Sequence, residues 1–477
     1  MYHKLQLIEV VITDLAEKNQ CFGKLDDGMS VFVTGIVAIG DIVEAEVYKI
    51  KKNYLMAKLI KILKPAETRI KPVCNYFGVC GGCKWQHLNY YEQLRLKQKQ
   101  VQDALKYIGK FQNIQCDICI GSKNIFNYRN KVDFSFTDMR YLTNEELMSP
   151  EKTIFKPINF ALGFHASGFY SKALDIDHCY LATQSMNKIL NLVRSFCLKY
   201  NNFLPIYSTR THEGELRNLI IRHSPHTSEI MVNLVTTNYN SKYMDLLKQE
   251  LKSDKELNIT TFINSTTNAK NNSGIGKEEY LLEGNGYIID RIGKYSYQVS
   301  PNSFFQTNTE QAEVLYKNII NIADIKSADV IYDLFCGTGS ITLFASEHCN
   351  KILGIEIVDS SIKDANINAK RNNVKNCKFI KFDIKDIKAL RSLCNAFSMP
   401  DIIITDPPRA GMHQNAINMI HEWKPRTIVY VSCNPSSLAR DGALICKDNQ
   451  YQLTKCIPID LFPQTNHVES IAKFERI

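Results

Sequence analysis

The sequence predicts a multidomain α/β protein with a small N-terminal β-barrel, a central α+β region and a Rossmann-like C-terminal domain. Three observations lead to this prediction. The chain has 477 residues, enough for two to four domains. Its first part consists of short strand-like runs separated by turns such as "DDGMS" and "AIGD". From residue 296 onward, short apolar runs alternate with helical intervals, which is typical of a parallel, doubly wound sheet. We place the domains at 1–62, 63–295 and 296–477.

The N-terminal segment carries the alternation of half-buried strands. In "IVEAEVYKI" the apolar residues Val43, Ala45 and Val47 alternate with polar ones. The run "YKIKKNY" then places Lys49, Lys51 and Lys52 among tyrosines. Such a run is either a solvated hairpin tip or a nucleic-acid contact, with cations for phosphates and aromatic rings for bases. The net charge of +9 fits a polyanionic partner.

The central segment holds a cysteine cluster. "CNYFGVCGGC" places Cys74, Cys80 and Cys83 in a C-x5-C-x2-C spacing, and Cys179 in "LDIDHCYL" is a candidate fourth member. The simplest alternative is a set of scattered buried thiols, but tight spacing with glycines is unusual for core packing. Four thiolates suit either zinc or an iron–sulfur cluster. The spacing differs from the C-x3-C-x2-C of radical S-adenosylmethionine enzymes. Elsewhere in this segment, "NSTTNAKNNSG" (264–274) is polar and predicts a loop.

The C-terminal segment contains a glycine-rich loop, "DLFCGTGSITL", between a predicted strand and a predicted helix. The third glycine of the dinucleotide fingerprint would fall at Thr342, which disfavours NAD. Acids instead end successive strand runs at Asp333, Glu356 and Asp383. Acids there can accept hydrogen bonds from ribose hydroxyls, because the carboxyl ends of such strands bind ligands. The pattern resembles class I S-adenosylmethionine methyltransferases.

Two further strand ends carry the predicted chemistry. "IIITDPPRAG" places Asp406 at one, and Arg409 stands where methyltransferases of exocyclic amines have an aromatic residue. "TIVYVSCNPSS" places Cys433 before Asn434 and Pro435, which predict a helix start. A lone cysteine is more simply a small buried hydrophobe, but a helix N-terminus favours a thiolate.

A thiolate and a base are what methylation of carbon 5 of a pyrimidine requires. The thiolate adds to carbon 6 so that carbon 5 becomes nucleophilic, and a base later removes the carbon 5 proton. "LFPQTNHVESIAKF" offers Glu469 as that base. Alone, Glu469 would be taken for a surface acid; the combination with Cys433 favours catalysis.

Five motifs occur in order along the chain: "FFQTN", "DLFCGTGS", "DPPRAG", "SCNPSS" and "DLFPQTNHVE". Together they resemble the RNA (uracil-5-)-methyltransferases. The resemblance implies Cys433 as nucleophile and Glu469 as base. It implies S-adenosyl-L-methionine bound at these positions: Gln306, Phe335, Ser340, Glu356, Asp383 and Asp406. Close relatives often carry asparagine at the position of Ser340. It also implies a [4Fe-4S] cluster on Cys74, Cys80, Cys83 and Cys179.

The first domain resembles the TRAM domain, an OB-like RNA-binding barrel of the ribosomal branch of this family. The tRNA branch lacks the barrel and the cysteine cluster, so both features favour 23S ribosomal RNA as the substrate. The chain has no apolar run long enough to span a membrane and no signal peptide, so we expect a cytoplasmic enzyme, acting as a monomer on an unstacked or flipped uridine. The alternatives are a tRNA uracil-5-methyltransferase and a non-catalytic RNA-binding assembly factor.

Overall fold

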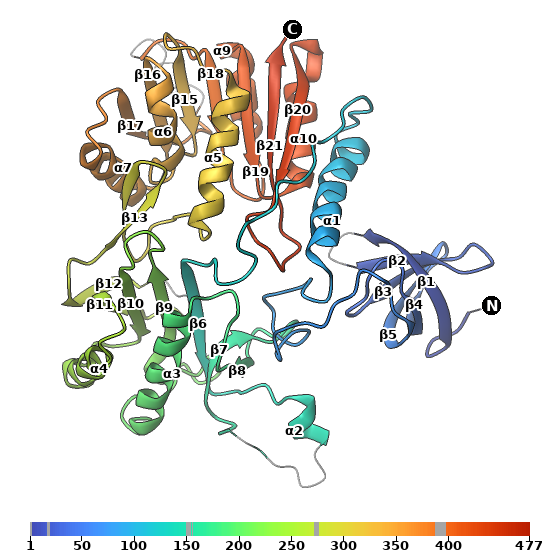
Figure 1. Ribbon diagram of the computed structural model, residues 1–477, viewed down its shortest axis with the longest axis vertical. Helices are drawn as coiled ribbons and strands as arrows, with labels where there is room; N and C mark the ends of the chain where they lie inside the picture. The colour runs from blue at the N-terminus through green and yellow to red at the C-terminus, as the bar shows by residue number, and fades with distance from the viewer. Residues whose placement is uncertain (1, 17–19, 149–153, 155, 271–275, 387–396) are drawn as a thin grey trace.

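The computed structural model describes residues 2–16, 20–148, 154, 156–270, 276–386 and 397–477. It contains a barrel, a central sheet and a C-terminal sheet, with the barrel beside the other two (Figure 1). No helix in the described ranges is long and apolar enough to cross a membrane.

The predicted barrel is confirmed. Its strands close in the order β1-β2-β3-β5-β4. They are β1 (Leu7–Ala16), β2 (Gln20–Lys24), β3 (Ser30–Thr34), β4 (Ile42–Ile50) and β5 (Tyr54–Lys64). Alternate residues such as Val31, Val43 and Leu55 fill its interior, as the period of two requires. The barrel is fixed to the following segment by the Arg69 guanidinium, which lies 2.7 Å from the buried Asp41 carboxylate.

The central region is a mixed sheet in the order β12-β11-β10-β9-β6-β7-β8. Its strands are β6 (Lys131–Thr137), β7 (Ala161–His165), β8 (Ala173–Asp175), β9 (Leu216–His223), β10 (Ile230–Thr236), β11 (Ile259–Thr266) and β12 (Glu278–Glu283). The helices α3 (Gln184–Lys199) and α4 (Ser241–Ser253) pack on one face of this sheet, and the short α2 (Asn144–Met148) lies at its margin (Figure 1). The region is therefore α+β, as predicted.

The predicted loop 264–274 is wrong at its beginning. Residues Asn264 to Thr266 form the end of β11 and are buried. The side chain of Asn264 donates to the Leu234 carbonyl, 2.7 Å away, and to the Thr236 hydroxyl, 2.9 Å away. Pairing with β10 thus satisfies the side chain of Asn264, a residue whose local preference is for turns. Residues 271–275 lie outside the described residues.

The C-terminal sheet has the order β17-β16-β15-β18-β19-β21-β20, and β21 runs antiparallel to both of its neighbours, β19 and β20. They are β15 (Val330–Leu334), β16 (Lys351–Glu356), β17 (Cys377–Lys381), β18 (Ile402–Thr405), β19 (Thr427–Ser432), β20 (Tyr451–Ile459) and β21 (Glu469–Arg476). One face packs against α5 (Thr309–Ala323), α6 (Ser340–Ala345) and α7 (Asp359–Arg371). The other packs against α9 (Gln414–Trp423) and α10 (Pro435–Ile445). The predicted doubly wound fold is confirmed, and the strand order reverses between β15 and β18.

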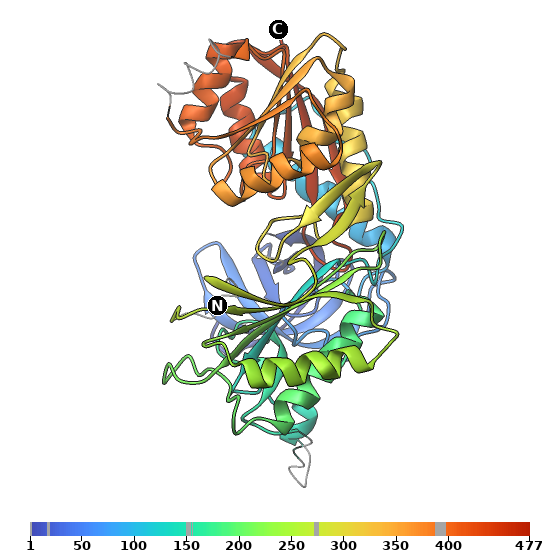
Figure 2. The ribbon, with the colours of Figure 1, turned by 90° about the vertical axis from the view of Figure 1, so that its left-hand side faces the viewer.

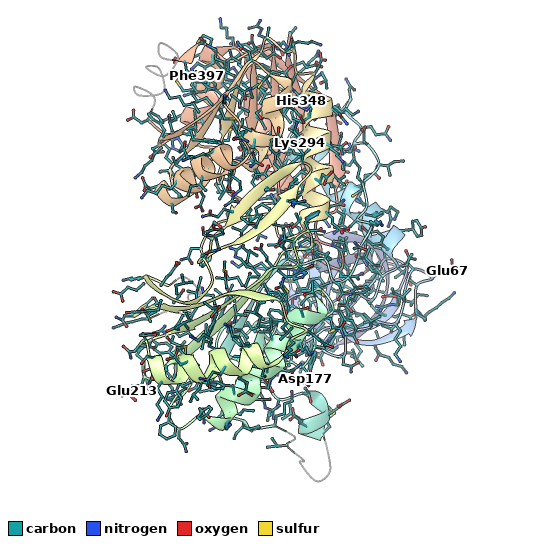
Figure 3. All side chains as sticks on the ribbon, turned by 60° about the vertical axis from the view of Figure 1, so that its left-hand side comes forward. Glu67, Asp177, Glu213, Lys294, His348 and Phe397 are labelled. Carbon is teal, nitrogen blue, oxygen red and sulfur yellow. The ribbon has the colours of Figure 1, made fainter. Side chains whose placement is uncertain are left out.

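Two segments ahead of residue 296 pack with the C-terminal sheet. The helix α1 (Tyr90–Asp103) and the π-helical turn after it (Ala104–Ile108) lie beside β20 and α10 (Figure 1). The hairpin β13 (Ile288–Ile292) and β14 (Tyr295–Val299) lies between the two large sheets (Figure 2). Figure 3 places Lys294, in the turn of this hairpin, near His348, and both contact Glu347. The C-terminal core therefore includes residues that our boundary assigned to the central domain.

Candidate active site and cysteine cluster

Strand pairing brings Cys433 and Glu469 together. Cys433 directly follows β19, Glu469 begins β21, and Ser432 pairs with Ser470. One further step along both strands places Cys433 opposite Glu469, where Cα atoms are about 4.5 to 5.5 Å apart in antiparallel sheets. The predicted helix start is confirmed, since Asn434 caps α10 by accepting from the Ser436 amide at 3.1 Å.

The pKa of the Cys433 thiol is raised from its ordinary value. Burial is the main cause, and the nearby carboxyls of Glu469 and Asp406 add to it. Arg409 lowers this pKa through its charge and through a hydrogen bond, but does not offset the other effects. The helix N-terminus favours the thiolate, whereas burial and the two nearby acids favour the protonated thiol.

The two acids at this edge of the sheet are themselves perturbed. Burial, followed by the charge of Asp406, raises the pKa of Glu469 well above its usual range. Burial also raises the pKa of Asp406, which follows β18, to about 6. Arg409 opposes the rise at Glu469. The Arg409 carbonyl accepts from the Asn434 side chain at 2.9 Å, which links the "DPPRAG" loop to the "SCNPSS" turn.

Arg409 is the residue of this group that the sequence interpretation did not assign to the site. Its position was noted only as evidence against amine methylation, since an aromatic residue was missing there. The available signal was the pair of prolines before it, which restrict the backbone of the loop that carries it.

The predicted cofactor positions lie along the carboxyl edge of the sheet. Phe335 has φ of 65°, and Gly337 and Gly339 also have positive φ, so the chain turns sharply between β15 and α6. A side chain on Gly337 would meet no atom within 4 Å, which leaves open space over the loop. The Glu356 carboxylate accepts from the Gly337 amide at 3.2 Å and from two amides after β16. Asp383 lies just beyond β17 and accepts from the Lys385 amide at 2.9 Å.

Two further predicted positions lie beside this loop. The Ser340 hydroxyl is 2.7 Å from the Tyr316 hydroxyl, so it is held by α5. Gln306 is buried, and its carbonyl accepts from the Asn130 side chain at 2.7 Å. The segment before α5 is thereby tied to the central sheet.

Asp333 is a fully buried acid under the glycine loop. The Thr342 hydroxyl donates to one of its oxygens at 2.5 Å, while the other oxygen has no hydrogen-bond partner. Burial raises the pKa of Asp333 to about 7, and Asp406 and Glu356 contribute. The site thus holds several acids whose ionised forms are disfavoured by burial.

The four predicted cluster cysteines line one cavity of about 430 Å³. Burial raises the pKa of Cys80 to about 11 and that of Cys83 to about 12, and in both cases the charges of Cys74 and Cys179 add to the rise. Within the described ranges, no set of three or more His, Cys, Asp or Glu side chains is arranged closely enough to hold a metal ion.

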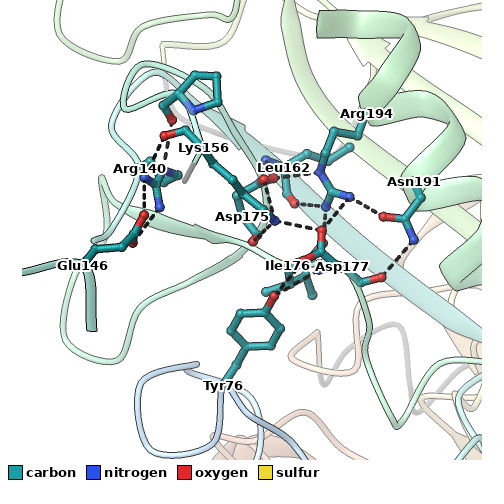
Figure 4. A network of polar contacts seen from close by, with 11 residues as sticks. Tyr76, Arg140, Glu146, Lys156, Leu162, Asp175, Ile176, Asp177, Asn191 and Arg194 are labelled. Carbon is teal, nitrogen blue, oxygen red and sulfur yellow. Dashed lines mark hydrogen bonds and ion pairs between the residues drawn. The ribbon is translucent and has the colours of Figure 1, made fainter. Parts of the chain in front are cut away.

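A polar network holds the two cysteine-bearing segments together (Figure 4). The Tyr76 hydroxyl donates to the Asp177 carboxylate at 3.2 Å and accepts from the Asp177 amide at 3.3 Å. Asp177 in turn contacts Lys156 at 2.8 Å and Arg194 at 3.5 Å. Tyr76 lies between Cys74 and Cys80, and Asp177 lies shortly before Cys179, so the network ties the segment of Cys74 and Cys80 to that of Cys179.

Comparisons with known proteins assign a family to the N-terminal and to the C-terminal part of the chain. Residues 226–477 match the family described as tRNA (Uracil-5-)-methyltransferase, and residues 5–60 match the TRAM domain. An uncharacterized RNA methyltransferase of Chlorobaculum tepidum is 46% identical over 475 residues, covering 100% of this chain and 97% of the relative. One of Bacteroides thetaiotaomicron is 38% identical over 463 residues, covering 97% and 100%.

Among solved structures, the chain resembles the Pyrococcus abyssi tRNA (uracil-54, C5)-methyltransferase in complex with S-adenosyl-L-homocysteine. The TM-score is 0.73 at 25% identity, over 98% of this chain and 100% of the other. Because this match extends over the barrel, the barrel does not exclude a tRNA substrate, contrary to our expectation. The matched families, the near full-length relatives and the predicted motifs agree: the chain belongs to the RNA (uracil-5-)-methyltransferase family and begins with a TRAM domain.

Proposed function

We propose that this protein methylates carbon 5 of a uridine in RNA, with Cys433 as nucleophile, Glu469 as base and S-adenosyl-L-methionine as methyl donor. The observation that carries this proposal is the cross-strand placement of Cys433 opposite Glu469 at the carboxyl edge of the sheet. A nucleophile and a base on two paired strands can act on neighbouring atoms of one pyrimidine ring.

The steps follow from the residues. The Cys433 thiolate adds to carbon 6, and the electron pair of the 5,6 double bond moves toward the ring carbonyl. Carbon 5 then takes the methyl group as the donor's carbon–sulfur bond breaks. Glu469 removes the proton from carbon 5, the double bond re-forms, and the thiolate leaves. Arg409 lowers the pKa of both Cys433 and Glu469, which favours the ionised forms that these steps need.

The acids of the site fit a cationic methyl donor. Removal from water raises the pKa of both Asp333 and Asp406, and the charges of Asp406 and Glu356 add to the rise at Asp333. S-adenosyl-L-methionine brings a sulfonium and an ammonium group. We assign its binding to Gln306, Phe335, Ser340, Glu356, Asp383 and Asp406, with Glu356 and Asp383 on the strand ends suited to ribose and adenine.

The RNA substrate that we propose first is 23S ribosomal RNA, on the resemblance to the ribosomal branch of the family. Transfer RNA is the second candidate, because the Pyrococcus abyssi enzyme with the same full-length architecture acts on tRNA. Mapping 5-methyluridine in both RNA classes from a deletion strain separates them. Loss of the modified base from one class, restored by the wild-type gene but not by Cys433→Ala, identifies the substrate.

The mechanism is tested with RNA that contains 5-fluorouridine. The wild-type enzyme should form a covalent adduct that survives denaturation, because fluorine cannot be removed as a proton is. Cys433→Ala should form none and should still bind the methyl donor. Glu469→Gln should instead accumulate an adduct with unmodified uridine RNA. Normal turnover by Cys433→Ala would refute the mechanism.

We also propose that Cys74, Cys80, Cys83 and Cys179 hold a [4Fe-4S] cluster. The donor chemistry supports this, since four thiols line one cavity and the charges of Cys179, Cys80 and Cys74 add to the burial that raises the pKa of Cys83. Such a cluster would fix the cysteine-bearing loops in place. Anaerobically purified protein should contain about four irons per chain; stoichiometric zinc without iron would reject the cluster.

The barrel is proposed as an RNA contact. Lys49, Lys51 and Lys52 are exposed around the turn between β4 and β5. Beside them, an outward-facing row of rings crosses three strands, with Phe22 and Phe32 centroids 5.4 Å apart and Phe32 and Tyr54 centroids 5.3 Å apart. Cations beside aromatic rings suit single-stranded RNA. The expected monomeric state and cytoplasmic location remain predictions.

A further inference from the structure

The segment before Glu469 is a buried loop, residues 460–468, which we call the base loop. It connects β20 to β21. Asp460, Gln464 and Thr465 in it are at most 2% exposed, and Gln464 has a positive φ of 70°. A non-glycine residue in the left-handed region costs free energy, so surrounding contacts must hold it there.

Gln93 of α1 supplies one set of these contacts. Its side-chain oxygen accepts from the Gln464 amide at 2.9 Å, and its side-chain nitrogen donates to the Gln464 side-chain oxygen at 3.1 Å. The same nitrogen lies within hydrogen-bonding distance of the carbonyls of Trp85 and Leu88. Gln93 is completely buried, so no water competes for these bonds.

Lys97, one turn further along α1, holds the start of the base loop. Its ammonium group lies 2.5 Å from the Asp460 carboxylate and 3.1 Å from the Phe462 carbonyl, and both ionic side chains are fully buried. The Tyr90 hydroxyl donates to the other Asp460 oxygen at 3.0 Å. Buried ion pairs of this kind are better suited to fixing one geometry than to adding stability.

The backbone that follows the cysteine cluster makes a third set of contacts. The amides of Lys84 and Trp85 both donate to the Gln464 carbonyl, at 2.9 and 3.0 Å. These residues come directly after Cys83. Gln464 is therefore held at its amide, its carbonyl and its side chain by residues more than 350 positions earlier in the chain.

We propose that residues 84–97 clamp the base loop and thereby hold Glu469 in position for proton removal, with Gln93 as a positioning residue. This inference rests on the proposed role of Glu469. Displacement of a base by about 1 Å slows its step by about a hundredfold, whereas addition of Cys433 and methyl transfer precede that step. Loosening the clamp should therefore retard proton removal specifically.

The test compares Gln93→Met with Gln98→Met in the full-length enzyme. Gln98 lies on the same helix and makes no hydrogen bond to the base loop in the described structure. Gln93→Met should lower turnover by about tenfold to a hundredfold, accumulate a covalent adduct with unmodified uridine RNA, and show an increased isotope effect with uridine deuterated at carbon 5. Gln98→Met should match wild type in all three measurements.

A second variant, Gln464→Met, tests the same proposal if Gln93→Met does not fold. It removes the side-chain acceptor but keeps the backbone contacts, so it should show the same pattern with a smaller effect. Slower turnover without adduct and without a larger isotope effect, in whichever variant folds, would overturn the clamp. Failure of Glu469→Gln to accumulate adduct would instead overturn the proposed role of Glu469, and the two failures are thereby distinguished.

Discussion

The buried acids predict a steep pH dependence for binding of the methyl donor. The pKa of Asp333 is raised to about 7 and that of Asp406 to about 6, both from 3.8, because burial disfavours the charged forms. A cationic ligand favours the ionised carboxylates, so affinity should rise with pH. At pH 5 an acid with a pKa of about 7 is ionised in about one molecule in a hundred, and one with a pKa of about 6 in about one in ten.

Between pH 5 and pH 8 the dissociation constant for S-adenosyl-L-methionine should therefore fall by about a hundredfold through Asp333 and by a further factor of about ten through Asp406. The hundredfold part corresponds to about 2.7 kcal/mol. The free energy of unfolding of the protein without the methyl donor should instead fall as pH rises. The native acids keep protons that the unfolded chain releases above pH 3.8, so these groups make the protein less stable as pH rises toward 7.

Calorimetric titration at several pH values measures how the dissociation constant for S-adenosyl-L-methionine depends on pH. Asp333→Asn and Asp406→Asn are the variants to compare with wild type. Asp333→Asn should remove the larger part of the pH dependence of methyl-donor affinity, and Asp406→Asn the smaller part. The control is Asp448→Asn, which changes an exposed acid ahead of β20 and should leave the slope intact. A flat affinity from pH 5 to pH 8, or an unchanged slope in Asp333→Asn, would refute the reasoning.

The remaining predictions concern the nucleophile, the acid network, the cluster and the barrel. Arg409→Met should move the pH midpoint of Cys433 alkylation upward, because Arg409 lowers the pKa of that thiol; an unchanged midpoint in a thiol-modification assay would count against this. Thr342→Val removes the hydrogen bond that favours the Asp333 carboxylate, so methyl-donor affinity measured at pH 7 should fall about tenfold, by loss of a bond to a charged group. Cys80→Ser should lower both iron content and melting temperature, since metal binding is coupled to folding; retained iron on elemental analysis would exclude this thiol as a ligand. The triple change of the barrel lysines 49, 51 and 52 to alanine should flatten the salt dependence of RNA affinity by about 0.7 to 0.9 per lost phosphate contact, and unchanged titrations at two salt concentrations would leave the barrel as a scaffold.

Local features of the chain sufficed to predict that most candidate residues of the C-terminal site lie at one edge of the sheet. Glu356, Asp406 and Cys433 each lie at or directly after the end of a short apolar run, and parallel strands place such ends at one edge. The register of β21 against β19 was not visible locally, because it depends on an antiparallel return of the chain. The nearness of Glu469 to Cys433 therefore came from the family resemblance.

Features that depend on distant partners could not be predicted. No local pattern in the sequence indicates that Gln93 and Lys97 contact a loop near the end of the chain. Likewise, Asn264 has a preference for turns, and only its buried hydrogen bonds to β10 explain its place in a strand. The pKa of Cys433 depends on how closely Glu469 and Asp406 approach, which no spacing in the sequence specifies.

The charges around Cys433 imply an order of events in the proposed reaction. Burial and the acids Glu469 and Asp406 disfavour a thiolate at Cys433, and Arg409 opposes them. The sulfonium of the methyl donor, placed beside Asp406, would add positive charge and lower the pKa of both Cys433 and Asp406. We therefore expect the thiolate fraction of Cys433 to increase when the methyl donor binds. Addition to a uridine without a methyl donor gives an adduct that can only reverse, so a thiol that ionises mainly after the donor binds would spend less time in unproductive adducts with RNA.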